Sequence, residues 1–476
     1  MKYKVPEQYY FRIHHVRPRF KGDVEGVLVY IAEEISRIGE RPTEEFKDGL
    51  NSAIIRYPGN ATKELKTINN WRTEIASLFG FVEQNELMVK PGRRALELAQ
   101  KQDLVEAFKI FLYNFQYPGA HIKPKETLKQ ICAGIRFKPA KYILKLLRYA
   151  NRNGGNSFGI TKAEVCHCVF NDLRVTRDNE DVDKTWARII YNRNSGMTYD
   201  TTGDVIRYAG DIIDYMKIAD LLTSFDGRTY YLNTLEEEMI IKFTESSEWF
   251  SDYDNMLDAR SGTIEEVHEI SSDWFSYVNR DMGETDFSTD IFAYIADDGS
   301  SDLKDAKYLQ YPFIDIEEEM ESNGTEKSKK DIGDFGENLI YAHEQMRMKL
   351  SGREDLVHLV KRIPTQYAVG YDICSSEIAD ASKRFIEVKT TVSSKPLVFN
   401  RVHLTPNEWS MASTTRQNYY VYRLMLSRGS IRLFLLQDPV GLYKNDQVKM
   451  NLNDGVDIIF DPKKVGKEEK LLIWKD

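Results

Sequence analysis

Three residues near the C-terminal end, Glu387, Val388 and Lys389, form an acid-x-lysine triplet within the segment RFIEVKTT. The triplet alone carries little information, because six other acid-x-lysine triplets occur in the chain. Its setting is more informative. Alternate residues of a strand share one face, so Glu387 and Lys389 are expected to project together from an otherwise apolar strand. Asp372 lies on the preceding predicted strand, and side-by-side strands would bring it close to Glu387.

Two carboxylates and a lysine suit metal-assisted hydrolysis of a phosphodiester. Mg²⁺ prefers hard oxygen ligands and binds through one or two carboxylates while keeping several waters. It activates an attacking water and offsets charge in the transition state, and a neighbouring lysine can orient or deprotonate that water. We therefore predict Asp372, Glu387 and the carbonyl of Val388 as metal ligands. Lys389 is predicted as a catalytic residue, and Glu337 as a further acid that reaches in from a helix.

The elements that would position these residues begin after residue 331. In order, the pattern predicts a glycine-led helix over 333–350 carrying Glu337, strands over 367–376, 383–391 and 396–404, a helix over 405–413, and strands over 418–426 and 430–438. The second helix has a complete start. Thr405 is its N-cap, Pro406 occupies the first position, and Glu408 stands at the third position of a capping box.

The segments GENLI, GYDI and FIEVKTT together resemble the PD-(D/E)xK nuclease family, whose fold has the same helix–strand–strand–strand–helix–strand order. The resemblance implies that Asp372 is the family's strand aspartate and Glu337 its helix glutamate. Glu387 and Lys389 match its second acid and its lysine. It also implies Mg²⁺ or Mn²⁺ as the cofactor. Tyr371 stands where the family's proline is expected.

A later stretch, HLTPNEWSMAS followed by YYVYRLML, is similar to a restriction-enzyme-associated branch of that superfamily. Asn407 and Glu408 fit the motif of this branch. Glu408 is already explained as a helix-capping residue, so neither residue is included in the predicted catalytic set.

The N-terminal half contains two outlines of helices followed by a short strand pair. The first has an amphipathic helix over 62–80, two short strands around Gln84 and a new helix that starts with Pro91 as its early-turn proline. The second opens with a capping box at Thr161 and Glu164 and ends in a hairpin around Asp226 and Gly227. Both resemble winged-helix domains. Together with the stretch FQYPG, they resemble recognition regions of type II restriction enzymes that bind one place and cut nearby.

The most basic part of the chain is 121–160, with nine Lys and Arg residues and one acid. Lys141, Lys145, Arg148 and Arg152 have spacings that place them on one stripe of a helix. Such a stripe is an ordinary solvated face or a phosphate-facing surface, and its lack of acids favours DNA. Further DNA-binding candidates lie on the amphipathic helix over 62–80, namely Lys66, Asn69 and Arg72.

Composition limits the class of protein. The net charge is −9, but the acids gather at 231–330, which holds 26 Asp and Glu against 8 Lys and Arg. The flanking parts therefore remain suited to nucleic acid. The four cysteines, and an N-terminus without a secretory signal, predict a cytoplasmic protein without membrane segments. Cys166 and Cys168 lack a second ligand pair for zinc, so we expect them to be buried as small apolar residues.

We therefore predict a multidomain α+β protein. Two mostly helical winged-helix-like DNA-recognition domains are expected over 1–105 and 106–235, an acidic helical connector and linker over 236–330, and a PD-(D/E)xK nuclease domain with an αβββαβ core over 331–476. The expected activity is sequence-specific, Mg²⁺-dependent cleavage of double-stranded DNA by a type II restriction endonuclease.

The expected partners are DNA, a separate methyltransferase and a transient homodimer formed through the nuclease domain. Two alternatives remain open. One is a modification-dependent or structure-selective nuclease of the same fold, and the other is a non-catalytic DNA-binding regulator.

Overall fold

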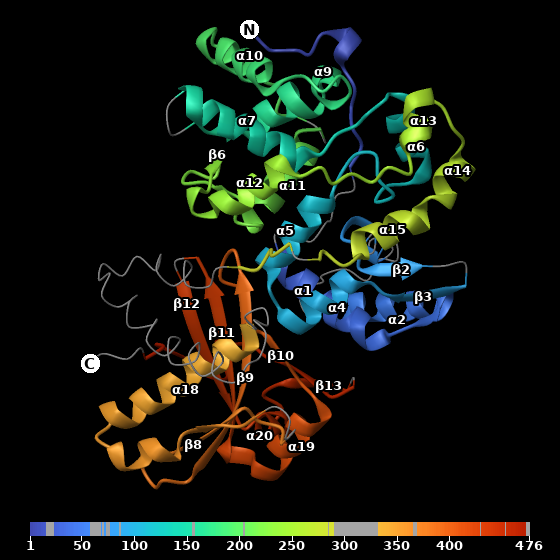
Figure 1. Cartoon of the computed structure of the whole chain (residues 1–476). Helices are drawn as coiled ribbons and strands as arrows, with labels where there is room; N and C mark the ends of the chain where they lie inside the picture. The colour runs from blue at the N-terminus through green and yellow to red at the C-terminus, as the bar shows by residue number, and fades with distance from the viewer. Residues whose placement is uncertain are drawn as a thin grey trace. The chain divides into compact units, whose positions relative to one another are not determined.

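The computed structural model describes residues 1–15, 23–57, 68, 71–72, 77–84, 87–154, 158–202, 205–283, 285–289, 332–364, 369–428, 430–452 and 454–472. The chain divides into two compact units. Unit 1 comprises Met1–Gln100 and Leu104–Phe287, whereas unit 2 comprises Lys101–Asp103 and Ser288–Asp476. Figure 1 shows unit 1 in blue to yellow and most of unit 2 in orange to red.

Unit 1 begins with helices and a small sheet. Its first elements are α1 (Val24–Ile38), β1 (Arg41–Pro42), α2 (Thr43–Arg56), β2 (Val82–Gln84), β3 (Met88–Pro91) and α4 (Arg93–Lys101). The three strands pair antiparallel in the order β1-β3-β2. The predicted strand pair around Gln84 is present, although Pro91 ends β3 and does not start the helix. Most of the helix predicted over 62–80 lies outside the described residues.

A second helical group follows and ends in another small sheet. It contains α5 (Leu104–Asn114), α6 (Pro124–Cys132), α7 (Pro139–Gly154), β4 (Ile160–Thr161), α8 (Lys162–Val165), a π-helical turn (Cys166–Phe170), α9 (Leu173–Thr176), α10 (Val182–Asn194), α11 (Val205–Ile218), β5 (Leu222–Thr223) and β6 (Thr229–Leu232). The sheet order is β4-β6-β5. The capping box predicted for Thr161 and Glu164 is present, as is the hairpin around Gly227.

The acidic stretch after β6 folds onto unit 1. It forms α12 (Glu237–Glu245), α13 (Asp254–Ala259), α14 (Ile264–Glu269) and α15 (Ser271–Asn279). Aromatic residues of this stretch, among them Phe250, Tyr253 and Trp274, share a buried cluster with Ile131 of α6. The helices expected here therefore exist, and their aromatic side chains explain why so acidic a segment is ordered. The linker expected over 321–330 lies outside the described residues.

Unit 2 is built around a six-stranded sheet. Its elements are α18 (Ile332–Leu350), a 3₁₀ helix (Glu354–Leu359), β7 (Lys361–Arg362), β8 (Ile373–Ser376), β9 (Lys383–Ser393), β10 (Arg401–Leu404), α19 (Pro406–Thr415), β11 (Tyr419–Ser427), β12 (Ser430–Gln437), α20 (Pro439–Lys444), β13 (Lys449–Leu452), β14 (Val456–Ile459) and β15 (Lys467–Glu469). The sheet order is β15-β12-β11-β9-β8-β7, with β9 and β11 parallel. Figure 1 shows β12, β11 and β9 side by side.

One predicted strand belongs elsewhere. The segment predicted as a strand over 396–404 forms β10, but β10 pairs with β14 in a separate sheet of order β10-β14-β13. The expectation that it continues the sheet of β8 and β9 is therefore wrong. The short strand β7, which the sequence pattern did not predict, pairs with β8. The order α18, β7, β8, β9, α19 and β11 again gives helix, three strands, helix and strand.

The two faces of β9 have different neighbours. On one face, Thr390 lies under Gly336 of α18, and Glu344 of α18 accepts a 2.8 Å hydrogen bond from the Tyr422 hydroxyl of β11. The other face carries Glu387 and Lys389. On that face, Tyr419 and Val421 of β11 join Ala412 of α19 in the main apolar cluster of unit 2. The central strand is therefore covered on both sides.

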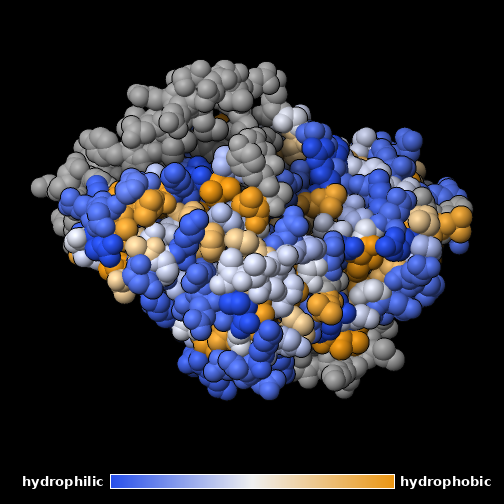
Figure 2. Space-filling view, turned by 90° about the horizontal axis from the view of Figure 1, so that it is seen from below, coloured by the Kyte–Doolittle hydropathy of each residue, from blue (hydrophilic) through white to orange (hydrophobic). Residues whose placement is uncertain are grey.

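In the described part of the chain, no helix has the length and apolar character needed to cross a membrane. On the face drawn in Figure 2, hydrophobic residues form separate small patches among hydrophilic ones.

Candidate active site

Asp372, directly before β8, lies beside Glu387 of the adjacent strand β9. β8 and β9 run antiparallel with Ile373 opposite Ile386, and the Asp372 N–H donates a 2.9 Å hydrogen bond to the Ile386 carbonyl. Extending this register by one residue puts Asp372 opposite Glu387, and such pairs have Cβ atoms about 5 Å apart. The Asp372 Oδ2 atom also accepts a 2.7 Å hydrogen bond from the Val388 N–H. Both carboxylates therefore lie on one face of the sheet.

Lys389 lies between two carboxylates. Its Nζ atom is 2.6 Å from Oε1 of Glu387 and 3.1 Å from Oε1 of Glu408. From the sequence, Glu408 was explained as a helix-capping residue and left out of the predicted catalytic set. The capping box at the start of α19 is present, but only one oxygen of Glu408 takes part in it. The spacing of the TPNEW segment predicted the cap, whereas the contact with Lys389 depends on how α19 packs beside β9.

Burial dominates the electrostatics of the site. It raises the pKa of Glu387 well above its ordinary value. The charges of Asp372 and Glu408 raise that pKa further, although Lys389 opposes them. Burial likewise raises the pKa of Asp372, while its bond from the Val388 N–H works against the shift.

The pKa of Lys389 is raised, because Glu387 and Glu408 outweigh the opposing effect of burial. Lys389 is therefore an ammonium ion in this arrangement.

Glu337 approaches the site from α18 and is paired with an arginine. Its Oε2 atom accepts a 2.7 Å hydrogen bond from Nη2 of Arg362 on β7. Burial and the nearby charge of Asp372 raise the pKa of Glu337 to about 7 despite this pair. The charge of Asp372 thus acts on Glu337, whose carboxylate is hydrogen-bonded to Arg362.

The donor set fits a divalent cation of the Mg²⁺ type. Among the described residues, no group of three or more His, Cys, Asp or Glu side chains is arranged to hold a metal ion. Mg²⁺ needs only one or two carboxylates, however, because waters and substrate oxygens complete its coordination. Asp372, Glu387 and Glu408 place three carboxylates around the single ammonium of Lys389. Burial raises the pKa values of Asp372 and Glu387, and a bound cation would favour the charged forms of these carboxyl groups.

The predicted DNA-binding stripe on α7 is present, but two of its four cations are hydrogen-bonded within the protein and two are exposed. Lys141 donates a hydrogen bond to the carbonyl of Ser246, and Arg148 donates one of 2.6 Å to Oγ1 of Thr244. Both therefore help to fasten α7 to the chain around the end of α12. Lys145 and Arg152 are exposed.

A cavity of about 720 Å³ beside α7 is lined by residues that include Lys141 and Lys145. A second cavity, of about 520 Å³, has Lys145, Arg148 and Arg152 among its lining residues. The basic stripe therefore borders hollow surface along its length.

The remaining residues singled out in the sequence are three further DNA-binding candidates and two cysteines. Lys66 and Asn69 lie outside the described residues, and Arg72 donates a 2.8 Å hydrogen bond to Oδ1 of Asn51. Cys166 and Cys168 are buried, and burial raises the pKa of their thiols to about 12 and about 11. Both are packed as small apolar residues, as expected.

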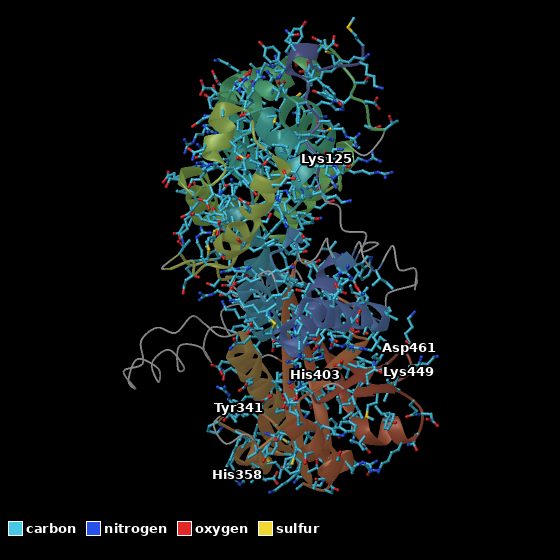
Figure 3. The ribbon with its side chains drawn as sticks, turned by 90° about the vertical axis from the view of Figure 1, so that its right-hand side faces the viewer. Lys125, Tyr341, His358, His403, Lys449 and Asp461 are labelled. Carbon is cyan, nitrogen blue, oxygen red and sulfur yellow. The ribbon has the colours of Figure 1, made fainter. Side chains whose placement is uncertain are left out.

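Figure 3 marks two of the histidines in unit 2, His403 and His358. His403 pairs with Asp457 at 2.9 Å, and His358 is exposed. His343 is buried and accepts a 2.9 Å hydrogen bond from the Leu472 N–H.

The fold and the site define a class: a two-unit protein in which a helical unit with two small sheets accompanies an α/β unit holding a buried carboxylate–lysine cluster. The family model "Restriction endonuclease BpuJI - N terminal" matches residues 3–275, more than half of the chain. The chain therefore belongs to this restriction endonuclease family. The resemblance to type II restriction enzymes of the IIS-like kind, predicted from the sequence, is confirmed.

Two further comparisons bear on the two units. A second family model, "Protein NO VEIN, C-terminal", matches residues 336–436, a range that includes Asp372, Glu387, Lys389 and Glu408. Among solved structures, "Crystal structure of pyrene- and phenanthrene-modified DNA in complex with the BpuJ1 endonuclease binding domain" matches with a TM-score of 0.51 and 22% sequence identity. The match covers 57% of this chain and 99% of that one. No curated protein matches the chain.

Proposed function

We propose that this protein is a Mg²⁺-dependent, sequence-specific endonuclease for double-stranded DNA, with recognition in unit 1 and cleavage in unit 2. The observation that carries the proposal is the juxtaposition of Asp372, Glu387 and Lys389. A lysine ammonium lies 2.6 Å from one of two facing carboxylates, on the central strand of a sheet. Hard oxygen ligands suit Mg²⁺, which assists phosphodiester hydrolysis, and a fixed cation can stabilise the charge that develops on the phosphate.

The architecture of unit 2 supports a PD-(D/E)xK nuclease. Its αβββαβ order, from α18 to β11, is the order implied by the family resemblance, with β7 in place of β10. The predicted aspartate directly precedes β8, and the second acid and the lysine lie on β9. This arrangement also disfavours the alternative of a non-catalytic regulator, because the charged residues of the motif are all present and clustered.

In the proposed mechanism, Asp372 and Glu387 would hold Mg²⁺ through their carboxylates, and the carbonyl of Val388 would be a further ligand. Mn²⁺ would fit the same ligands. The chemistry supplied by such an ion would be polarisation of the phosphodiester and a lower pKa of the attacking water. Glu387 and Glu408 raise the pKa of Lys389, which favours its charged form. We assign Lys389 to orienting the attacking water and to stabilising negative charge on the phosphate.

Unit 1 is proposed to bind DNA through two winged-helix modules. The first is formed by α1, β1, α2, β2 and β3, and the second by β4, α8, α11, β5 and β6. Each has a three-stranded sheet whose last two strands form a hairpin after the helices. The similar solved structure is a BpuJ1 endonuclease binding domain in complex with modified DNA, and this supports DNA as the ligand of the same fold here.

The restriction role implies two further partners. A separate methyltransferase would protect host DNA. Cleavage of both strands needs two active sites or two visits by one, so a transient homodimer through unit 2 is proposed. Action on DNA inside a cell also supports the predicted cytoplasmic location.

Digestion of long phage DNA tests the proposal. The protein is incubated with the DNA in Mg²⁺, in Mn²⁺ and in EDTA, and the products are separated on a gel. Discrete fragments with either metal ion, and intact DNA in EDTA, are expected. Intact DNA under all three conditions, or equal cutting in EDTA, would overturn the proposed activity.

A further inference from the structure

We propose that Glu408 is a positioning residue that holds the Lys389 ammonium at the site independently of Glu387. The inference rests on the proposed nuclease function and adds a residue to it. Glu408 fits the motif of the restriction-enzyme-associated branch, but the predicted catalytic set left it out because it is also explained as a capping residue.

The two oxygens of the Glu408 carboxylate have separate contacts. Oε2 accepts a 2.9 Å hydrogen bond from the Thr405 N–H and completes the capping box of α19. Oε1 is 3.1 Å from Nζ of Lys389. Helix capping requires only the contact with the Thr405 N–H. The contact with Lys389 is additional. The second oxygen reaches into the active site, where the Lys389 side chain is only 24% exposed.

Glu387 cannot be the sole anchor of Lys389 if it also binds the metal ion. Its Oε1 atom is the closer partner of Lys389, at 2.6 Å, but a ligating carboxylate shares its charge with the ion. A lysine side chain has four rotatable bonds, so without another anchor its ammonium would lose its fixed position. Glu408 supplies that anchor from a different element.

The start of α19 packs against the chain segment that leads to Asp372 and β8. Gly370 has a φ angle of +84°, and a Cβ atom built on it would lie 2.6 Å from the carbonyl oxygen of Asn407. The hydroxyl of Tyr419 donates a 3.0 Å hydrogen bond to the Gly370 carbonyl. The close packing of Gly370 on Asn407 fixes the backbone next to Glu408 relative to Asp372. The position of Glu408 is therefore determined by the same contacts that shape the site.

The substitution Glu408→Gln separates positioning from capping. Glutamine also serves at the third position of a capping box, so its carbonyl oxygen can keep the bond from the Thr405 N–H. Its amide nitrogen then faces the Lys389 ammonium, and two donors cannot bond to each other. Thr405→Ala is the matched control. It removes the other half of the box and leaves the Glu408 carboxylate facing Lys389.

Cleavage is measured under single turnover on phage DNA with Mg²⁺, and DNA affinity is measured in EDTA. Glu408→Gln should lower the cleavage rate by about 10- to 100-fold, the usual cost of removing a residue that orients an active-site group. Its DNA affinity should stay within about twofold of the wild type. Thr405→Ala should lower the melting temperature and cut within about threefold of the wild-type rate.

Thermal melting in EDTA provides a readout that does not depend on activity. In a Lys389→Ala background, Glu408 and Glu387 face each other without their shared cation, so Glu408→Gln should raise the melting temperature. With Lys389 present, the same change should leave it unchanged or lower it. Equal shifts in the two backgrounds would show that the pair is uncoupled and would overturn the inference.

The outcomes separate the two proposals. If the wild type does not cut, or if Lys389→Ala cuts equally well, the proposed nuclease function fails and this inference fails with it. If the wild type cuts, Lys389→Ala does not and Glu408→Gln cuts at the wild-type rate, only the role of Glu408 is wrong. An equal loss of cleavage in Thr405→Ala would assign Glu408 to capping alone.

Discussion

Gly336 of α18 lies directly against Thr390 of β9. A Cβ atom built on Gly336 would be 1.7 Å from Oγ1 of Thr390, far inside any allowed contact. Thr390 is buried and follows Lys389 on the strand that carries the site, whereas Gly336 immediately precedes Glu337. This contact therefore sets how closely the helix of Glu337 approaches the catalytic strand.

Gly336→Ala should destabilise unit 2 by roughly 1–3 kcal/mol, the usual cost of forcing extra volume into a packed site. The helix must also lift from β9, so DNA cleavage should fall more than DNA binding does. Thr390→Ala in the same chain removes the closest clashing atom and should recover part of both losses. Urea unfolding and cleavage rates measure the effects. Wild-type stability of Gly336→Ala would show that α18 does not pack this closely on β9.

The exposed cations of the α7 stripe should contribute to DNA affinity. Each lysine or arginine that contacts a phosphate adds about 0.9 to the slope of log K against log salt concentration. The double variant Lys145→Ala/Arg152→Ala should therefore bind DNA more weakly and flatten this slope by up to about 1.8. Fluorescence anisotropy over a range of salt concentrations gives the slope directly.

Lys141 and Arg148 on the same stripe provide the contrast, because both already bond to the chain around the end of α12. Changing them to alanine should lower the melting temperature of unit 1 more than the exposed pair does. If Lys145→Ala/Arg152→Ala leaves the slope of log K against log salt concentration unchanged, this face of α7 does not contact DNA and is ordinary solvated surface.

Buried His121 should make the protein sensitive to mild acid. Burial lowers the pKa of its ring well below 6.5, and His15 and His14 add to the effect. The folded state therefore keeps His121 neutral, while the unfolded state gains a proton below about pH 6.5. Stability must then fall as the pH falls through that value, by up to about 1.4 kcal/mol per pH unit for this residue.

His121→Phe tests this prediction, because the ring lies among aromatic neighbours such as Phe115 and Trp274. The variant should lose less stability than the wild type between pH 7 and pH 5, measured by urea unfolding. His358→Asn is the control, since that ring is exposed (Figure 3). Equal pH slopes in the wild type and His121→Phe would contradict the prediction.

Local signals in the sequence predicted much of unit 2. Alternation along RFIEVKTT gave the face shared by Glu387 and Lys389, and the TPNEW pattern gave the start of α19, because both depend on nearby residues. The pairing of β10 with β14, whose partners are more than fifty residues apart, has no local signature. β7 is only two residues long and offers no periodic pattern to detect.

The part of the site that was missed depends on tertiary packing. Glu408 has a complete local explanation as a capping residue, so nothing in its neighbourhood indicated Lys389 as a partner. Arg362, which binds Glu337, lies on the undetected strand β7. On α7, the spacing placed four cations on one stripe but could not show that Lys141 and Arg148 are held by residues near the end of α12.

The most direct test compares two lysines of β9 in one cleavage assay. Lys389 lies between carboxylates at the site, whereas Lys383 is exposed at the start of the same strand. Both are changed to alanine, and the variants are incubated with phage DNA and Mg²⁺ after equal DNA affinity has been verified in EDTA. Loss of cleavage in Lys389→Ala, with wild-type fragments from Lys383→Ala, is the expected result. Wild-type cleavage by Lys389→Ala would refute the proposed active site.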